Sequence, residues 1–106
     1  MHSYKDLIAW QKAMVLNELV YRLTGALPRT ERRGLVDQMR RSANSIPSNL
    51  AEGYRMRTNA HILHYARIAF GSASELETQV LLTKRLRLAL PELIEPAERC
   101  LDDVQR

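Results

Sequence analysis

The segment QMRRSANSIPSNLAEG, residues 38–53, decides the fold of this chain. Its apolar residues recur at the spacing of one helix face, and its polar and basic residues occupy the other face. Pro47 lies inside that pattern, although a proline in a helix interior removes one backbone hydrogen bond at a cost of roughly 3 kcal/mol. The segment therefore predicts a helix whose kink is held in place by packing against neighbouring helices.

Helical periodicity extends along almost the whole chain, and no alternating β-branched run or Asn-Gly turn indicates a strand. The pattern predicts four helices, over residues 6–24, 30–54, 59–88 and from 91 onward. The connections between them are short, which favours helices that run antiparallel to their neighbours. We therefore expect an all-α fold, an antiparallel up-down-up-down four-helix bundle in which residues 1–106 form a single domain.

Capping residues set the expected helix ends. Ser3 followed by Asp6 resembles a capping box at the start of the first helix. Thr30 is the expected N-cap of the second helix, and Thr58 or Asn59 is that of the third. Pro91 opens the fourth helix at its first turn, where a proline is tolerated.

Two of the predicted helices carry more apolar surface than one core requires. The apolar arc of the first helix exceeds the ~100° that a single core needs. The third helix has one apolar seam at Ile62, Tyr65, Ala69, Ala73, Leu76 and Val80. A second seam, offset by ~100° or more at helical spacing, consists of Leu63, Phe70, Leu81 and Leu88. The first helix is therefore expected either to be a central helix of the bundle or to contact another subunit as well, and the third is expected to make contacts beyond a single four-helix core.

Charge is unevenly distributed along the chain. Residues 1–67 contain eleven Lys and Arg against five Asp and Glu, whereas residues 68–106 contain five against seven. The basic first part favours an acidic partner such as nucleic acid. The single cysteine, Cys100, cannot form an intramolecular disulfide and is typical of a reducing cytoplasm. No segment resembles a membrane span or a signal peptide, so a cytoplasmic location without membrane contact is expected.

The basic side chains gather in and around the second predicted helix, at Arg29, Arg32, Arg33, Arg40, Arg41, Arg55 and Arg57. Asp37 and Glu52 stand at helical pairing distances from four of them, so a solvated face laced with salt bridges is one interpretation. The other interpretation is a surface that binds the phosphates of RNA or DNA. These seven arginines are the candidate nucleic-acid-binding residues.

Nothing in the chain favours an enzyme, a cofactor or a metal site. His61 and His64 stand three residues apart, but no cysteine or carboxylate in the same turns completes a metal site. The glycines are isolated, so no phosphate-cradling loop is present. Glu77 lies between the two apolar seams, which predicts either an ion pair with Arg40 or Arg41 or a position at the bundle's edge that reaches water.

The chain resembles the 23S rRNA intervening-sequence protein family, which includes accessory variability proteins of diversity-generating retroelements. The resemblance spans about residues 4–82 and is most specific in two patterns, Ser-Ile-Pro-Ser-Asn-x-Ala-Glu-Gly at 45–53 and Gly-Ser-x-x-Glu-Leu-Glu at 71–77. Further matches are Leu7, residues 10–13, Tyr21, Pro28, Glu31, Gly34, Leu35 and residues 68–69.

This resemblance implies a four-helix bundle that assembles into a ring-like homopentamer. For the retroelement branch it also implies a basic surface that binds nucleic acid and contact with a reverse transcriptase. The polar residues of the family's patterns could instead form hydrogen bonds between helices; they are Arg40, Asn44, Ser48, Asn49, Glu52, Glu75 and Glu77.

Two functions follow from these observations. The first is a non-enzymatic, oligomeric accessory protein that contacts RNA or DNA phosphates through its arginines. The alternative is a protein-interaction scaffold that docks a reverse transcriptase or another protein without touching nucleic acid. A scaffold should neutralise its arginines with acidic neighbours, namely Asp37, Glu52, Glu75 and Glu95, whereas a nucleic-acid-binding protein should leave them free and clustered.

Overall fold

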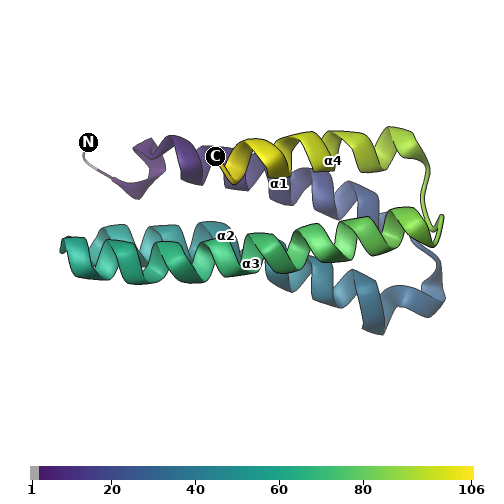
Figure 1. The fold of residues 1–106 in the computed structure, drawn as a ribbon, viewed down its shortest axis with the longest axis horizontal. Helices are drawn as coiled ribbons and strands as arrows, with labels where there is room; N and C mark the ends of the chain where they lie inside the picture. Colours follow the sequence, from purple (N-terminus) through teal and green to yellow (C-terminus); the bar gives the residue numbers. More distant parts are fainter. Residues whose placement is uncertain (1–2) are drawn as a thin grey trace.

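The computed structural model describes residues 3–106, and it is all-α over that range, with no strand. Four α-helices form it: α1 (Ile8–Gly25), α2 (Asp37–Met56), α3 (Asn59–Arg85) and α4 (Pro91–Val104). Each helix runs back alongside the one before it, as Figure 1 shows. The predicted all-α fold with four helices in up-down-up-down order is therefore confirmed.

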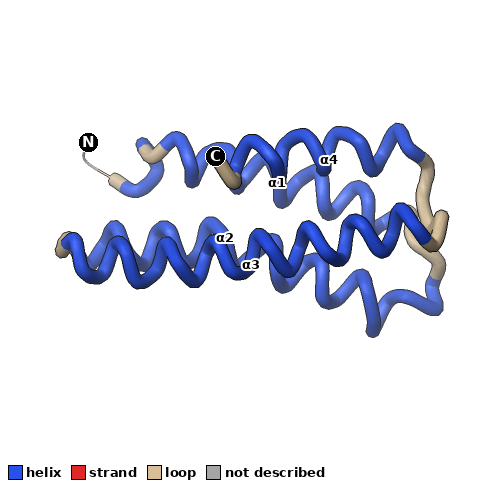
Figure 2. Tube along the Cα trace, viewed as in Figure 1, coloured by secondary structure: helices blue, strands red, loops and turns tan. Residues whose placement is uncertain are grey.

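The bundle is elongated, with extents of 43 × 22 × 18 Å, and its connections lie at the two ends (Figure 2). α2 and α3 lie side by side near the turn that joins them and separate toward the start of α2 (Figure 1). α1 and α4 form the other pair. Because α4 has only 14 residues, it ends well before it reaches the level where α3 begins.

The first helix begins later than the sequence predicts. Ser3 Oγ accepts a hydrogen bond from the Lys5 backbone N–H at 3.1 Å, which caps a short 3₁₀ turn, η1 (Tyr4–Asp6). α1 starts after Leu7, which offers no side-chain cap. The predicted capping residues are thus present, but they stabilise the turn that precedes α1.

The predicted start of the second helix is wrong. Thr30 lies inside a 3₁₀ turn, η2 (Arg29–Glu31), which is followed by a π-helical turn, η3 (Arg32–Val36). Gly34 leaves helical geometry within η3, with φ −105° and ψ −108°, so the helix cannot run continuously from Thr30 to α2. The wider turn buries both Leu35 and Val36 against the core.

The remaining helix ends agree closely with the sequence. Thr58 caps α3 by accepting a hydrogen bond from the His61 backbone N–H at 3.2 Å. Pro91 occupies the first turn of α4, as predicted. α3 ends at Arg85, three residues before the predicted end at Leu88, and Arg87 then adopts a left-handed conformation with φ 53°.

The core contains most of the apolar stripes that the periodicity predicts, but Ile62 of the first seam is 40% exposed and Tyr65 lies outside the core. It is formed by Ala13, Leu16, Val20, Leu23, Leu27, Leu35, Val36, Met39, Ala43, Ile46, Ala69, Ala73, Leu76, Val80, Ile94, Ala97, Leu101 and Val104. The second seam of α3 is largely left out of it. Leu63 and Phe70 are each 53% exposed and Leu81 is 46% exposed, whereas Leu88 packs against the core.

Pro47 lies in the middle of α2 and is buried. It has no backbone N–H, so the carbonyl of Ala43, four residues earlier, loses its helical hydrogen-bond partner. The side chain of Asn17 on α1 replaces that partner, since its Nδ2 donates to the Ala43 carbonyl oxygen at 2.7 Å. The kink is thus held by a hydrogen bond between two helices, in a buried position where an unpaired carbonyl would be costly.

The contact between α2 and α3 depends on small and polar side chains. Ser72 Oγ donates to Ser45 Oγ at 2.7 Å across the interface. A Cβ atom placed on Gly53 would lie 2.9 Å from Cβ of Tyr65 and 3.3 Å from the His61 carbonyl oxygen. Gly53 is therefore the position that allows the two backbones to approach closely.

No helix within residues 3–106 combines the length and the apolarity that a membrane crossing requires. The longest helix, α3, is interrupted by charged and polar side chains along its whole length.

Replacing Asn17 with alanine should lower the free energy of unfolding by about 1–3 kcal/mol, because the Ala43 carbonyl is then buried without a partner. In a Pro47→Ala background the new N–H of residue 47 can bind that carbonyl. The Asn17→Ala substitution should therefore lower the free energy of unfolding by less in that background. Urea denaturation of the four proteins in this double-mutant cycle should give a coupling of about 1 kcal/mol.

A suitable control for this cycle is Thr83→Val, because the buried Thr83 hydroxyl contacts Met39 Sδ and the Gln79 carbonyl, away from the proline. Its cost should be the same in both backgrounds. An equal cost for Asn17→Ala with and without Pro47 would show that the Asn17 amide does not compensate the proline.

The close approach at Gly53 predicts that Gly53→Ala destabilises the fold by roughly 1–3 kcal/mol, through overpacking against α3. Gly71→Ala is the matched control, since a Cβ on Gly71 meets nothing within 4 Å. The control should be neutral or stabilising by up to about 1 kcal/mol from helix propensity. Thermal and urea denaturation measure both; a Gly53→Ala protein as stable as the control would contradict the close packing.

Candidate nucleic-acid interface

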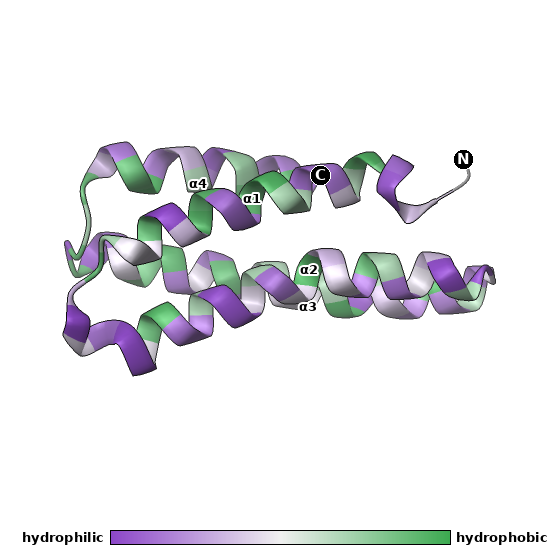
Figure 3. Cartoon of the chain, turned by 180° about the vertical axis from the view of Figure 1, so that it is seen from behind, coloured by the Kyte–Doolittle hydropathy of each residue, from purple (hydrophilic) through white to green (hydrophobic). Residues whose placement is uncertain are grey.

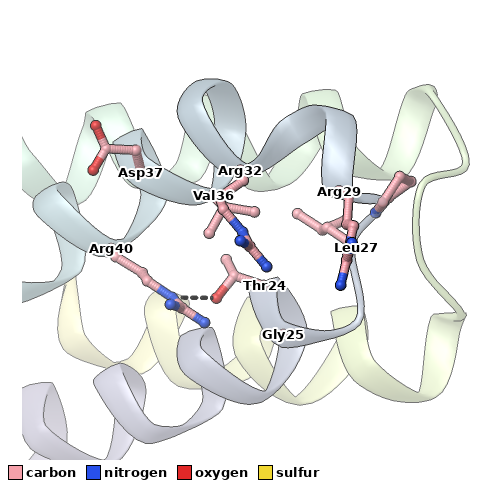
Figure 4. A pocket seen from close by; sticks show the side chains of 9 residues that line it. Thr24, Gly25, Leu27, Arg29, Arg32, Val36, Asp37 and Arg40 are labelled. Carbon is pink, nitrogen blue, oxygen red and sulfur yellow. Dashed lines mark hydrogen bonds between the residues drawn. The ribbon is translucent and has the colours of Figure 1, made fainter.

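A pocket of about 570 Å³ lies at the corner where the chain turns from α1 into α2. Figure 4 shows this corner pocket from close by. It is lined by Thr24, Gly25, Leu27, Pro28, Arg29, Arg32, Val36, Asp37 and Arg40. Three of the seven candidate arginines therefore meet in one hollow, although they stand up to eleven positions apart in the sequence. Figure 3 shows a concentrated hydrophilic segment in the same turn of the chain.

Arg40 is held firmly in the corner pocket by two groups of α1. Its Nε donates to Thr24 Oγ1 at 2.8 Å, and Thr24 Oγ1 in turn donates to the Val20 carbonyl at 2.8 Å. The guanidinium carbon of Arg40 lies 4.4 Å from the centroid of the Tyr21 ring, a cation–π contact. These contacts fix the orientation of the guanidinium, which lies beside Thr24 in the pocket lining (Figure 4).

Arg29 on η2 and Arg32 on η3 are exposed and direct their guanidinium groups into the same hollow (Figure 4). Over residues 3–106, neither forms an ion pair, and neither does Arg40. The one carboxylate of the lining belongs to Asp37. It forms an ion pair with Arg41, with 3.3 Å between Asp37 Oδ2 and Arg41 Nε, and it points away from the three guanidiniums (Figure 4). The lining of the corner pocket thus contains three arginines and one carboxylate that is already paired.

The other candidate arginines lie outside this pocket. Arg33 and Arg41 are exposed near it, and Arg41 is the partner of Asp37. Arg55 and Arg57 lie at the opposite end of α2, about 22 Å away at the rise of an α-helix. Arg55 is stacked near the Tyr4 ring, with 5.7 Å between its guanidinium carbon and the ring centroid, and Arg57 ends α2 with φ 61°. The seven arginines thus form two groups rather than one surface.

The structure contradicts the expected pairing of Glu77 with Arg40 or Arg41. Glu77 is exposed and lines a shallow hollow with Glu98 and Leu101 of α4, while Arg40 and Arg41 are engaged elsewhere. The reason is that this face of α3 lies toward α4 and not toward α2. The alternative expectation, a glutamate at the edge of the bundle that reaches water, describes the position observed.

The polar residues of the family patterns divide into two kinds. Asn44 Nδ2 donates to the Tyr21 hydroxyl at 3.1 Å, so it joins α2 to α1 as Arg40 does. Ser48 and Asn49 bond only within α2, to the backbone and side chains of the preceding turn. The three glutamates, Glu52, Glu75 and Glu77, are exposed.

The histidines of α3 and the single cysteine of α4 are not part of the corner pocket. His61 and His64 are exposed at the start of α3, and His61 Nδ1 lies 2.5 Å from the Thr58 hydroxyl. In the part of the chain that the structure describes, no three His, Cys, Asp or Glu residues are grouped as metal ligands. Partial burial raises the pKa of the Cys100 thiol; Asp103 raises it further and Lys12 opposes this. The thiol is thus protonated, and poorly nucleophilic, at neutral pH.

Sequence reasoning identified Arg40 but missed Thr24 and Tyr21, the two residues that orient it. A signal was available, because Thr24, like Asn17, is a polar residue within the mainly apolar inner stripe of the first helix. Assigning it a partner required the relative register of α1 and α2, which helical periodicity alone does not supply.

The fold and the corner pocket define a small all-α bundle with an arginine-lined pocket between its first two helices. Residues 5–106 match the family model of the 23S rRNA-intervening sequence protein. The match covers almost the whole chain, so the protein belongs to this family. No curated protein matches the chain in a sequence comparison.

Proposed function

We propose that this protein is a non-enzymatic accessory protein of the cytoplasm that binds RNA or DNA phosphates through its arginines and works as a homopentameric ring. One observation carries the binding proposal: Arg29, Arg32 and Arg40 line one pocket, and none of the three forms an ion pair among residues 3–106. Guanidinium groups bind phosphate oxygens in bidentate pairs, so three of them in one hollow form a suitable phosphate site.

The family also supports nucleic acid as the partner, because its description refers to an intervening sequence of 23S rRNA. RNA is accordingly the first ligand to test, and duplex DNA is the second. The isolated arginines Arg55 and Arg57 could add phosphate contacts at the other end of α2, since each phosphate neutralised by a cation adds to the affinity.

The apolar side chains left outside the core support the oligomer. Leu63, Phe70 and Leu81 follow one another along the same face of α3, and all three are about half exposed. Exposed apolar side chains that recur along one helix face mark an interaction surface, and here Ser74 and Glu77 stand between Phe70 and Leu81 on that face. In a ring of identical subunits the corner pocket would recur in each copy, so that weak phosphate contacts add through avidity.

The alternative is a scaffold that docks a protein such as a reverse transcriptase. The same exposed apolar face of α3 supports it. However, a scaffold should neutralise its arginines, and of the four acidic residues expected to do so only Asp37 forms an ion pair within residues 3–106. Nucleic-acid binding is therefore the better-supported proposal.

The binding proposal predicts salt-dependent affinity for structured RNA and for duplex DNA, measured by fluorescence anisotropy across a potassium chloride series. The logarithm of the affinity should fall with that of the salt concentration, with a slope of about −0.9 for each DNA phosphate contacted. The double variant Arg29→Glu/Arg32→Glu should abolish binding at low salt, because it reverses two charges in the corner pocket.

The matched control is Lys5→Glu/Arg99→Glu, which changes the net charge equally but alters exposed residues of η1 and α4, outside both the corner pocket and the apolar face of α3. It should retain most of the affinity. Loss of binding in both variants would indicate only a non-specific effect of net charge. Absence of binding by the wild-type protein at low salt would refute the proposal and favour the scaffold.

The proposed ring predicts a particle of five times the 12.2 kDa chain mass in native mass spectrometry and light scattering. Leu63→Asp/Phe70→Asp should shift the protein to smaller species, because both side chains are exposed in the single subunit and do not support its core. Gln11→Asp, at an exposed polar position of α1, is the control and should leave the assembly intact. A wild-type protein that stays monomeric at micromolar concentration would contradict the ring.

A further inference from the structure

We propose that the corner pocket takes the phosphorylated end of a nucleic-acid strand, rather than a phosphate within a continuous strand. This inference rests on the proposed function, since it names the part of a nucleic acid that the same arginines would hold. Three features of the pocket support it: its charge, its shape and the chemistry of its walls.

The charge of the corner pocket matches a phosphate monoester. Arg29, Arg32 and Arg40 surround the hollow, and the carboxylate of Asp37 is occupied by Arg41. A monoester carries about −1.5 to −2 charges at neutral pH and has three strongly accepting oxygens. A phosphate inside a strand carries a single negative charge and has only two free oxygens. Three convergent guanidiniums therefore gain more from a terminal phosphate than from an internal one.

The shape of the corner pocket also favours the end of a nucleic-acid strand. The connection from Gly25 to Arg29 bounds the hollow on one side, where it closes the corner of the bundle (Figure 4). A strand that continued in both directions would need a groove open at both ends. The pocket volume of about 570 Å³ also exceeds what a bare phosphate fills and lies in the range of sites for small organic ligands.

The walls of the corner pocket differ in chemistry. Leu27, Pro28 and Val36 line it beside the guanidinium groups, so that apolar and cationic surfaces are adjacent. A terminal nucleotide has the same division, with a charged phosphate at one end and a less polar sugar and base at the other. The anchored Arg40 supplies a fixed reference point, because Thr24 and Tyr21 hold its guanidinium before any ligand arrives.

The test compares single-stranded RNAs of one sequence that carry a 5′-phosphate, a 3′-phosphate or no terminal phosphate, each with an internal fluorophore. At fixed salt, a terminal phosphate should strengthen binding about tenfold or more. Arg40→Lys should remove this preference, because lysine keeps the charge but cannot form the bidentate pair. Arg29→Gln is a second variant, at an exposed position that does not support the core.

Arg55→Gln is the control, since Arg55 lies at the far end of α2. This variant should bind all three RNAs more weakly by the same factor and should keep the preference for a terminal phosphate. Adenosine monophosphate, inorganic phosphate and vesicles containing phosphatidic acid serve as competitors. Competition by any of them as strong as that by phosphorylated RNA would assign the pocket to a free nucleotide, a free anion or a lipid headgroup, and would overturn the inference.

The remaining outcomes separate this inference from the proposed function. Equal, salt-dependent binding of phosphorylated and unphosphorylated RNA would overturn the strand-end assignment and leave nucleic-acid binding intact. Failure of every RNA to bind would refute the proposed function, and the strand-end assignment with it.

Discussion

The hydrogen bond from the Asn17 side chain to the Ala43 carbonyl is the contact on which the arrangement of the first two helices depends. Pro47 frees that carbonyl in a buried position, where an unpaired carbonyl would be costly. Because the bond is short and directional, it fixes α1 against α2 both along their axes and in rotation. Two turns farther along α1 lies Thr24, and one turn back along α2 lies Arg40, so the same register brings these two side chains together.

Apolar burial and polar contacts contribute to this bundle in different ways. The leucine, valine and alanine stripes provide the bulk of the stabilisation, but such contacts are non-directional and would tolerate helices that slide past one another. Polar residues of α2 prevent such sliding on both sides of the helix. Asn44 and Arg40 form hydrogen bonds with side chains of α1, and Ser45 forms one with α3. One of them, Arg40, also presents its guanidinium to solvent in the corner pocket.

Most of the fold could be predicted from the sequence, because four amphipathic segments with short connections allow few arrangements. The start of the second helix could not, since residues 30–36 have ordinary helical composition and only the backbone of Gly34 reveals the interruption. Helical spacing placed Glu77 between two apolar seams but could not say that α4 was its neighbour. The candidate arginines were found as a group, whereas their division into two ends of α2 and the anchoring by Thr24 depend on tertiary register.

Gly34 divides the arginines of the corner pocket into two groups, which the backbone holds in different ways. Arg40 belongs to a regular helix and is braced by α1, whereas Arg29 and Arg32 belong to the irregular segment that precedes α2. Insertions and substitutions are tolerated far better in such connecting segments than in packed helices. Substitutions at residues 29–34 can therefore change the lining of the pocket without disturbing the packed helices. One wall of the pocket is fixed by the bundle, and the opposite wall is open to change.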